Sequence, residues 1–216
     1  MRVAPSIIAA DFTIIKQEIK KIEDAGADLL HLDVMDGVFV PNLTFGPMIV
    51  DALNRMTDLV LDAHLMIIKP ENYIERFIYT GADWISFHIE ATQTPDTCIE
   101  LIKKHKKMAG VAISPPTPLQ NILGWVERVD FVLVMTVNPG FYGQKLIPDL
   151  LNRIKKLKDF ITKENLNCLI EVDGGINIDN VQEFARVGTD IVVAGAGVFK
   201  SQDYKSAIQR LKCLKD

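Results

Sequence analysis

The chain has 216 residues, of which 48% are hydrophobic and 24% are charged, and its formal net charge at pH 7 is -4. This is the balance of a globular protein with ample apolar material for a core, and the length suits one domain over residues 1–216, because α/β barrels run to about 250 residues as a single unit. Lysine and arginine are scattered along segments of helical period instead of forming a basic stripe, which argues against a nucleic-acid partner.

Short β-rich runs alternate along the chain with longer segments of helical period. The expected strands span 3–8, 29–34, 60–66, 84–88, 108–113, 131–135, 168–172 and 191–194, and the expected helices span 13–25, 47–56, 70–79, 96–106, 119–126, 148–164, 181–187 and 204–214. Eight such units predict a parallel sheet with helices outside it, closed as a (β/α)8 TIM barrel. The alternative is a doubly wound open sheet, which normally carries a glycine-rich loop after its first strand, whereas "APSIIAADF" contains no glycine.

Glycines follow three of the expected helices. Gly26, Gly81 and Gly188 stand where a left-handed residue commonly ends a helix. The surrounding patterns "AGAD", "TGAD" and "VGTD" therefore predict three equivalent helix-to-strand turns.

The cysteines and the apolar segments indicate where the protein acts. Cys98, Cys168 and Cys213 are odd in number, far apart and without a CxxC pair, so that neither a disulfide framework nor a thiolate zinc site is expected. The apolar run at the N-terminus is too short for a signal peptide, and no segment approaches the about 20 apolar residues of a membrane span. We expect a cytoplasmic protein without a membrane partner.

The stretch "LLHLDVMDG" places charged residues inside an expected buried strand. Side chains alternate between the two faces of a strand, so His31, Asp33 and Met35 point one way and Leu32 and Val34 the other. The polar set is expected to face the barrel axis at the carboxyl end of the strand, where barrel enzymes place their chemistry.

Polar residues recur at the ends of other strands: His64 in "LDAHLM", Asp173 in "IEVDGG", and His88 with Glu90 in "SFHIEA". Buried carboxylates and imidazoles are costly unless they are paired or bind a metal. We therefore predict that His31, Asp33, His64 and Asp173 bind one divalent cation, which could be Zn²⁺, Fe²⁺, Mn²⁺ or Co²⁺. The alternative is that each histidine only forms a hydrogen bond. His88 and Glu90 are weaker candidates, for support of a ligand or for substrate contact.

Glycine-bearing loops follow the last three expected strands: "VNPGFYGQ", "VDGGIN" and "VAGAGVF". Glycine lets backbone N–H groups approach an anion closely, and barrels commonly bind phosphate with the loops after strands seven and eight. The predicted phosphate-binding residues are Gly143, Gly174, Gly175, Gly195 and Ala196. Met35, Met66 and Met135 fall at strand ends on the same rim, where they could form an apolar collar or simply fill the core.

These motifs, together with "APSIIAADF" and "HLDVMDGVFVPNLTFGP", closely resemble the ribulose-phosphate 3-epimerase family, in order from residue 4 to about residue 199. The resemblance implies a (β/α)8 barrel of the ribulose-phosphate-binding type with one catalytic metal, which interconverts D-ribulose 5-phosphate and D-xylulose 5-phosphate in the pentose phosphate pathway. The metal ligands of the family map onto His31, Asp33, His64 and Asp173, and its substrate-contacting serine maps onto Ser6. We expect Ser6, His64 and the three methionines to contact the sugar phosphate, and we expect a homo-oligomer.

Epimerisation beside a ketone needs a proton removed from one face of C3 and another delivered to the opposite face. Asp33 and Asp173 belong to strands two and seven, far apart around the ring, and are the expected acid/base pair around an ene-diolate intermediate. A sister epimerase acting on D-allulose 6-phosphate is the nearest alternative, although both glycines of "VDGGIN" disfavour it.

Three more distant alternatives fit less well. An orotidine-phosphate type decarboxylase would need a lysine where "DVMD" has Met35, and an isomerase without a metal would leave His31 and His64 unexplained. A non-catalytic sugar-phosphate binder would share the fold, since fold alone does not prove function. The chain also departs from the family pattern: Ala196 stands where serine is frequent, Ile89 replaces a frequent proline and Tyr142 a frequent glycine.

Overall fold

The computed structural model describes residues 1–141, 143–144, 146–147 and 149–213. The strands are β1 (Arg2–Pro5), β2 (Leu29–Met35), β3 (Val60–Met66), β4 (Trp84–His88), β5 (Met108–Ile113), β6 (Phe131–Met135), β7 (Leu169–Asp173) and β8 (Ile191–Ala194). The helices are α1 (Ile15–Asp24), α2 (Pro47–Asn54), α3 (Ile74–Tyr79), α4 (Pro95–Lys104), α5 (Gln120–Leu123), α6 (Leu150–Lys163), α7 (Val181–Arg186), α8 (Ala196–Phe199) and α9 (Tyr204–Leu211). Short 3-10 turns are η1 (Ile7–Ala9), η2 (Phe12–Ile14), η3 (Pro70–Asn72) and η4 (Ile89–Ala91).

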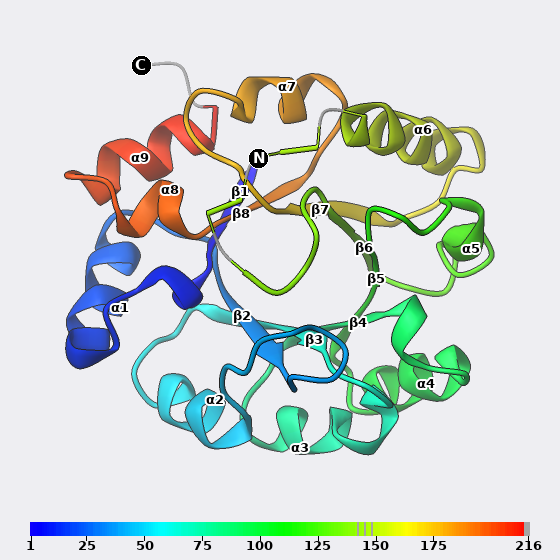
Figure 1. Cartoon of the computed structure of the whole chain (residues 1–216), viewed down its shortest axis with the longest axis horizontal. Helices are drawn as coiled ribbons and strands as arrows, with labels where there is room; N and C mark the ends of the chain where they lie inside the picture. The colour runs from blue at the N-terminus through cyan, green and yellow to red at the C-terminus, as the bar shows by residue number, and fades with distance from the viewer. Residues whose placement is uncertain (142, 145, 148, 214–216) are drawn as a thin grey trace.

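The strands form one parallel sheet that curls into a barrel, with the helices arranged around it (Figure 1). Neighbouring strands pair in the order β1-β8-β7-β6-β5-β4-β3-β2. An isolated parallel bridge between Ser6 and His31 joins the two ends of this order, so the ring closes at the end of β1. The predicted (β/α)8 architecture is confirmed, and the open doubly wound sheet is wrong.

Alternation along the strands divides the buried side chains into two sets, one between the sheet and the helices and one inside the barrel. Leu30, Leu32 and Val34 of β2 pack outward in the core between sheet and helices. Leu29, on the other face of β2, belongs to a separate cluster inside the barrel, together with Phe131. The amino-terminal part of the barrel is thus filled by apolar side chains, and the polar inward residues of β2 lie farther toward its carboxyl end.

Four aspartates repeat one device at the amino-terminal edge of the barrel. Each precedes an even-numbered strand and accepts a backbone N–H from the strand before it, through donor–acceptor pairs Val3 N to Asp28 at 2.8 Å, Leu61 N to Asp83 at 3.1 Å, Ala109 N to Asp130 at 2.8 Å and Ile170 N to Asp190 at 2.9 Å. Each aspartate N–H also donates to a carbonyl of the same neighbour strand. The three turns that contain "GAD" or "GTD" were predicted to be equivalent. The fourth turn, at Asp130, was not predicted, because its sequence lacks the glycine.

Several boundaries differ from the sequence prediction. The first strand stops at Pro5, because Ser6 caps the following 3-10 turn by accepting the N–H of Ile8. The short helix α8 was not predicted, since four residues give no readable period. Residues 148 and 214, the expected bounds of two helices, lie outside the described residues. Gly26, Gly81 and Gly188 have positive φ angles, as predicted. Within the described part of the chain, every helix is too short or too polar to cross a membrane.

We expect Asp130→Ala to lower the free energy of unfolding by about 1–3 kcal/mol, because the buried strand residue Ala109 would lose the acceptor of its N–H. Chemical denaturation measures the change. The control is Asp159→Ala, whose carboxylate pairs with Lys155 on the surface and whose loss should cost less than about 0.5 kcal/mol. Equal effects of the two substitutions would show that the repeated aspartates do not stabilise the sheet.

Candidate active site

The polar layer at the carboxyl end of the barrel is built by strand register. Alternation turns both His31 and Asp33 of β2 inward, and the pairing of β2 with β3 places Asp33 beside His64. His31 and His64 are fully buried, and Asp33 is 4% exposed. Asp173 ends β7 and reaches the same point from the other side.

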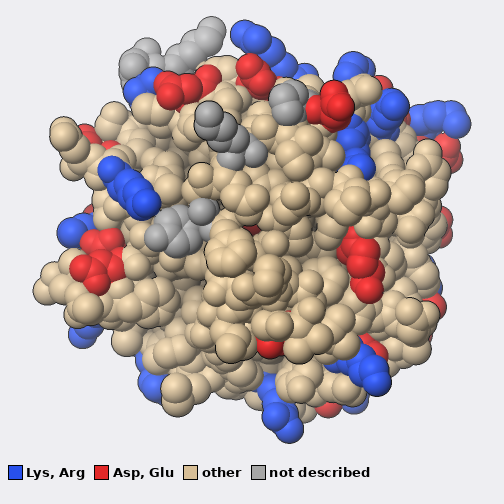
Figure 2. Space-filling view, viewed as in Figure 1, with Lys and Arg blue, Asp and Glu red and all other residues tan. Residues whose placement is uncertain are grey.

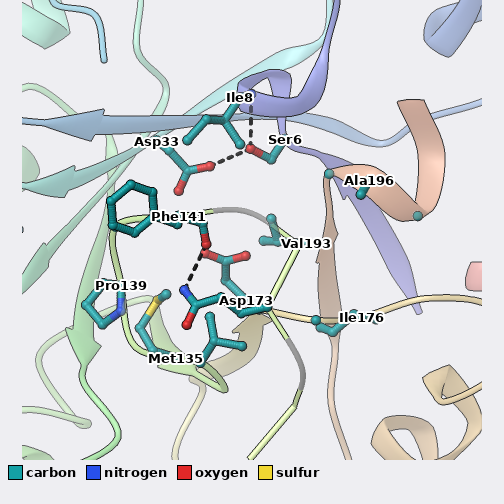
Figure 3. Close-up of a pocket in the computed structure, with 18 of the residues that line it drawn as sticks. Ser6, Ile8, Asp33, Met135, Pro139, Phe141, Asp173, Ile176, Val193 and Ala196 are labelled. Atoms are coloured by element: carbon teal, nitrogen blue, oxygen red, sulfur yellow. Dashed lines mark hydrogen bonds between the residues drawn. The ribbon is translucent and has the colours of Figure 1, made fainter. Parts of the chain in front are cut away.

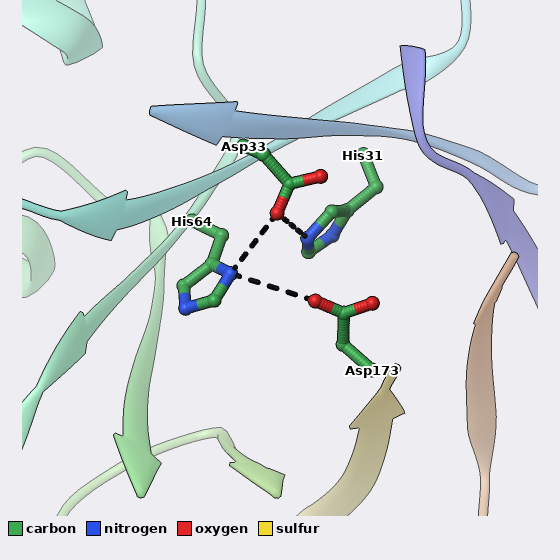
Figure 4. Close-up of side chains that lie close together, drawn as sticks. All are labelled: His31, Asp33, His64 and Asp173. Atoms are coloured by element: carbon green, nitrogen blue, oxygen red, sulfur yellow. Dashed lines mark ion pairs between the residues drawn. The ribbon is translucent and has the colours of Figure 1, made fainter. Parts of the chain in front are cut away.

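The four predicted ligands converge (Figure 4). One donor atom from each of His31, Asp33, His64 and Asp173 lies within 4.8 Å of those of the others. Oδ1 of Asp33 is 3.6 Å from Nε2 of His31 and 3.5 Å from Nδ1 of His64, which is itself 3.9 Å from Oδ2 of Asp173. β2 and β7 are separated by β1 and β8, so the two carboxylates approach from different sides, although their strands are not diametrically opposite.

Two imidazole nitrogens at this point are buried and lack a hydrogen bond. Nε2 of His31 and Nδ1 of His64 have no partner within the described part of the chain. An unpartnered buried polar atom costs free energy, and these two face carboxylate oxygens. Donor atoms about 2.0–2.2 Å from an ion in tetrahedral arrangement stand about 3.4 Å apart, close to the separations observed here. The donor set therefore fits a divalent cation of borderline hardness.

Neighbouring side chains orient three of the four donors. Nδ1 of His31 lies 2.6 Å from Oδ2 of Asp62, which leaves Nε2 facing the centre. Nε2 of His64 lies 2.9 Å from Nε2 of His88, which leaves Nδ1 facing the centre. The Ser6 hydroxyl donates to Oδ2 of Asp33, so that Oδ1 points at the two histidines.

The two carboxyl groups differ in acidity. Burial opposes the ionisation of Asp33, but His31 and His64 together hold its pKa well below the usual range. Burial raises the pKa of Asp173 to about 7, and the negative charge of Asp33 adds to this effect. Burial also lowers the pKa of His64 to about 4, which keeps this imidazole neutral, as a metal ligand must be. One carboxylate is thus set to be ionised while the other can carry a proton near neutrality.

A cavity of about 230 Å³ opens above this centre (Figure 3). Of the residues predicted to act at the site, the cavity is lined by Asp33, Asp173, Ser6, Met35, Met66, Met135, Gly143, Gly174, Gly175, Gly195 and Ala196. His31 and His64 are fully buried and are not part of this lining. The described lining residues include no lysine or arginine, so an anion in this cavity would be bound by backbone and neutral groups.

Charged side chains lie mainly around the edge of the face in Figure 2, which is seen from the same direction as Figure 1, and the centre of this face is largely uncharged. Phe141, 55% exposed, is one of the apolar residues at the cavity. The mouth of the barrel is therefore largely uncharged, and the charged groups of the centre lie beneath it.

The sequence analysis missed a second polar layer below the four donors. Asp62 and Glu171 are fully buried, and His31 joins them in a second group of donor atoms within 4.8 Å. Burial and the charge of Asp62 raise the pKa of Glu171 well above its usual value. Both residues precede a predicted ligand by two positions, as Asp62 precedes His64, so the strand alternation contained the signal.

Several residues that line the cavity were not among the predicted site residues. Val137, Pro139, Phe141, Gln144, Ile176 and Asn177 also line the cavity. They belong to the glycine-bearing loops "VNPGFYGQ" and "VDGGIN", in which only the glycines were predicted to bind phosphate. Ile89 begins the turn η4, and Tyr142 lies outside the described residues.

The barrel and its buried His/Asp centre define a class, that of (β/α)8-barrel enzymes with chemistry at the carboxyl ends of the strands. Comparison with known proteins narrows it. The family model described as "Ribulose-phosphate 3 epimerase family" matches residues 2–199. The chain belongs to this family and is an epimerase, an enzyme of the isomerase class.

Individual relatives agree with the family. The chain is 46% identical over 213 residues to the ribulose-phosphate 3-epimerase of Bacillus subtilis, covering 98% of each chain. It is 43% identical over 215 residues to the chloroplastic ribulose-5-phosphate-3-epimerase of Arabidopsis thaliana, covering 99% of this chain and 76% of that protein. A solved structure of KGPDC from Streptococcus mutans in complex with D-R5P matches with a TM-score of 0.74 at 16% identity, covering 98% of this chain and 95% of that chain, and shows a shared fold alone.

Proposed function

We propose that residues 1–216 act as one catalytic domain that interconverts D-ribulose 5-phosphate and D-xylulose 5-phosphate with the help of one divalent cation. The observation that carries this proposal is the convergence of two unpartnered imidazole nitrogens and two carboxylates beneath a cavity. Membership of the epimerase family supports the choice of reaction. D-allulose 6-phosphate remains the alternative substrate, so the deciding experiment is an epimerisation assay on both sugars with metal analysis of the same sample.

His31, Asp33, His64 and Asp173 would hold the cation, which could be Zn²⁺, Fe²⁺, Mn²⁺ or Co²⁺. When bound, it would act as a Lewis acid that polarises the oxygens at C2 and C3 of the sugar. The three methionines of the lining, Met35, Met66 and Met135, would exclude water around the reacting carbons.

Asp33 and Asp173 are the proposed acid/base pair. In one direction, one carboxylate removes the proton from C3, and the electron pair of the C–H bond forms the ene-diolate between C2 and C3. The carboxyl group of the other residue then returns a proton to the opposite face of C3, and the roles exchange in the reverse direction. The contrast between the lowered pKa of Asp33 and the raised pKa of Asp173 supports this division. Ser6, which donates to Asp33, would keep that carboxylate in place.

The phosphate group would lie against Gly143, Gly174, Gly175, Gly195 and Ala196, all of which line the cavity. Gly174 has a φ of 120°, and a Cβ there would stand 2.5 Å from the side chain of Val137, so only glycine fits this loop. Ala196 offers no hydroxyl, and its contribution would come from the backbone. The lack of cations in the described lining supports binding through backbone N–H groups.

Self-association and location stay predictions. Phe12, Leu43 and Met48 are exposed apolar residues, and Phe12 and Phe45 line an apolar groove, which supports the expected homo-oligomer. One relative is named as chloroplastic.

We expect His31→Ala and His64→Ala each to lower metal content and activity together, because each removes a donor and leaves two carboxylates facing each other. Metal analysis after gel filtration and a coupled epimerase assay measure both. His105→Ala is the control, since this histidine pairs with Glu75 away from the centre. Full metal occupancy with near-normal turnover in both site variants would refute the ligand assignment.

In ²H₂O the wild-type enzyme should place deuterium at C3 of the product, because the returned proton comes from a solvent-equilibrated carboxyl group. Asp173→Asn should abolish epimerisation while Asp33 still exchanges the C3 proton of one epimer. Mass spectrometry of substrate and product follows both events, and metal content is measured on the same sample. If the metal-loaded variant interconverts the epimers at an undiminished rate, a single-base mechanism through Asp33 replaces this one.

Ala196→Asp should raise KM by at least about tenfold with little change in kcat, because a negative charge in the cavity wall would repel the phosphate. Gln182→Glu adds the same charge on the exposed side of α7 and should leave KM unchanged. Steady-state kinetics compare the two. An unchanged KM in Ala196→Asp would place the phosphate elsewhere in the mouth.

A further inference from the structure

We propose that Glu90 and His88 form a proton-ordering relay that holds His64 in the tautomer able to bind a cation through Nδ1. Both are positioning residues, which act through His64 and do not touch the substrate. The inference rests on the proposed metal centre and adds to it the groups that prepare one of its ligands.

The relay is a continuous chain of contacts. Nε2 of His64 lies 2.9 Å from Nε2 of His88, and Nδ1 of His88 lies 3.1 Å from Oε2 of Glu90. The other oxygen of Glu90, Oε1, accepts the backbone N–H of Ser114 at 2.8 Å. Both imidazoles are fully buried, and the ring of Phe39 packs over His88 at a centroid distance of 4.8 Å. Water is therefore kept away from the two rings.

Hydrogen-bond chemistry gives this chain a direction. Burial would raise the pKa of Glu90, but its contact with His88 lowers this pKa to about 2. The Glu90 carboxylate is therefore ionised, and an ionised carboxylate only accepts hydrogen bonds. Nδ1 of His88 must then carry the proton. When each ring carries one proton, Nε2 of His88 is the acceptor and Nε2 of His64 is the donor. The lone pair of His64 is left on Nδ1, the atom without a hydrogen-bond partner among the described residues.

His31 offers an internal comparison. Its Nδ1 lies 2.6 Å from the carboxylate of Asp62, so a single direct contact selects the tautomer with a free Nε2. His64 has no carboxylate at its outer nitrogen, and its neighbour there is another imidazole, which could equally donate or accept. Glu90 removes this ambiguity. Metal-ligating histidines in general rely on such outer partners.

The position of the relay fits a role behind His64 and outside the cavity. Neither His88 nor Glu90 is among the described residues that line the cavity. His88 stacks on His64 with ring centroids 5.0 Å apart and lies behind it, with Ser114 Oγ 3.2 Å from its Nδ1. The hydroxyl of Ser114 can donate or accept, so it adapts to either tautomer and does not choose between them.

Glu90→Gln is the sharpest test, because it changes one acceptor into a donor with little change in shape. The backbone N–H of Ser114 can only donate, so it selects the amide oxygen of the new side chain. The amide NH₂ then faces Nδ1 of His88, which must become an acceptor. His88 would carry its proton on Nε2, and His64 would be driven to the Nδ1–H tautomer, which cannot bind a cation. Glu90→Ala leaves a gap, open to solvent, in which water can accept from His88, and it should disturb the relay less.

Two measurements read the relay directly. Competition with a chelator should give a Zn²⁺ affinity about 10- to 100-fold weaker in Glu90→Gln and a smaller loss in Glu90→Ala. Long-range ¹H–¹⁵N spectra distinguish the two tautomers of each ring, and the chain has only 4 histidines to assign. They should show His88 protonated at Nδ1 in the wild type and at Nε2 in Glu90→Gln. A purely structural role for Glu90 would not move this proton.

The matched control is Glu75→Gln, which changes the same chemical group at the same kind of contact. Oε1 of Glu75 lies 3.1 Å from Nε2 of His105, outside the centre, so Zn²⁺ affinity should not change. Wild-type affinity and an unmoved His88 proton in Glu90→Gln would overturn the relay while leaving the proposed metal centre intact. If the wild type itself binds no Zn²⁺, the metal centre fails, and the position of the His88 proton in the two proteins still decides whether the relay exists.

Discussion

The burial of two carboxylates and two imidazoles at one point inside the barrel is the constraint on which the rest of the site depends. Charges taken out of water are stable only when other groups replace the lost solvation. Asp33 receives a hydroxyl from Ser6, His31 a carboxylate from Asp62 and His64 a second imidazole from His88. One ring nitrogen of each histidine, facing the carboxylates, is left without a hydrogen-bond partner among the described residues, and the proposed cation would satisfy both together.

The barrel stabilises this arrangement by placing an apolar layer below the polar layers. Toward the amino-terminal end, apolar side chains such as Leu29 and Phe131 fill the interior, and a Cβ at Gly110 would stand 2.3 Å from the Phe131 ring. The dense lower layer supports the polar layers above it. The rim of loops then supplies a largely uncharged mouth, so an anionic substrate would meet backbone groups first and the buried charges only at its reacting carbons.

Stability and chemistry also use aspartate differently at the two ends. At the amino-terminal edge, Asp28, Asp83, Asp130 and Asp190 each accept a backbone N–H of a neighbouring strand, and all four have a lysine as a partner on the outside. At the carboxyl end, Asp33 and Asp173 point inward and their pKa values are shifted in opposite directions. The same side chain is thus an acceptor for the sheet at one end and a candidate acid/base at the other.

The sequence by itself determined the element order, five of the eight strands residue for residue, and the four donors of the centre. Period and alternation are local properties. The positions of His31 and Asp33 in their strand therefore show which face is polar without reference to any other segment. The sequence also indicated the glycine loops, because glycine restricts what a loop can be. It did not reveal the fourth aspartate turn, where Asp130 lacks the glycine of the others, or the short helix α8.

Only the tertiary structure decided which groups meet. The contact between His64 and His88 depends on the pairing of β3 with β4. The backbone N–H of Ser114, which follows β5, occupies one oxygen of Glu90 and leaves the other facing His88. A difference of a few tenths of an ångström decides whether two nitrogens are close enough for a hydrogen bond, and no sequence pattern predicts such a difference. The sequence therefore named the four groups of the proposed metal centre, and the packing of neighbouring strands decided which side chains contact them.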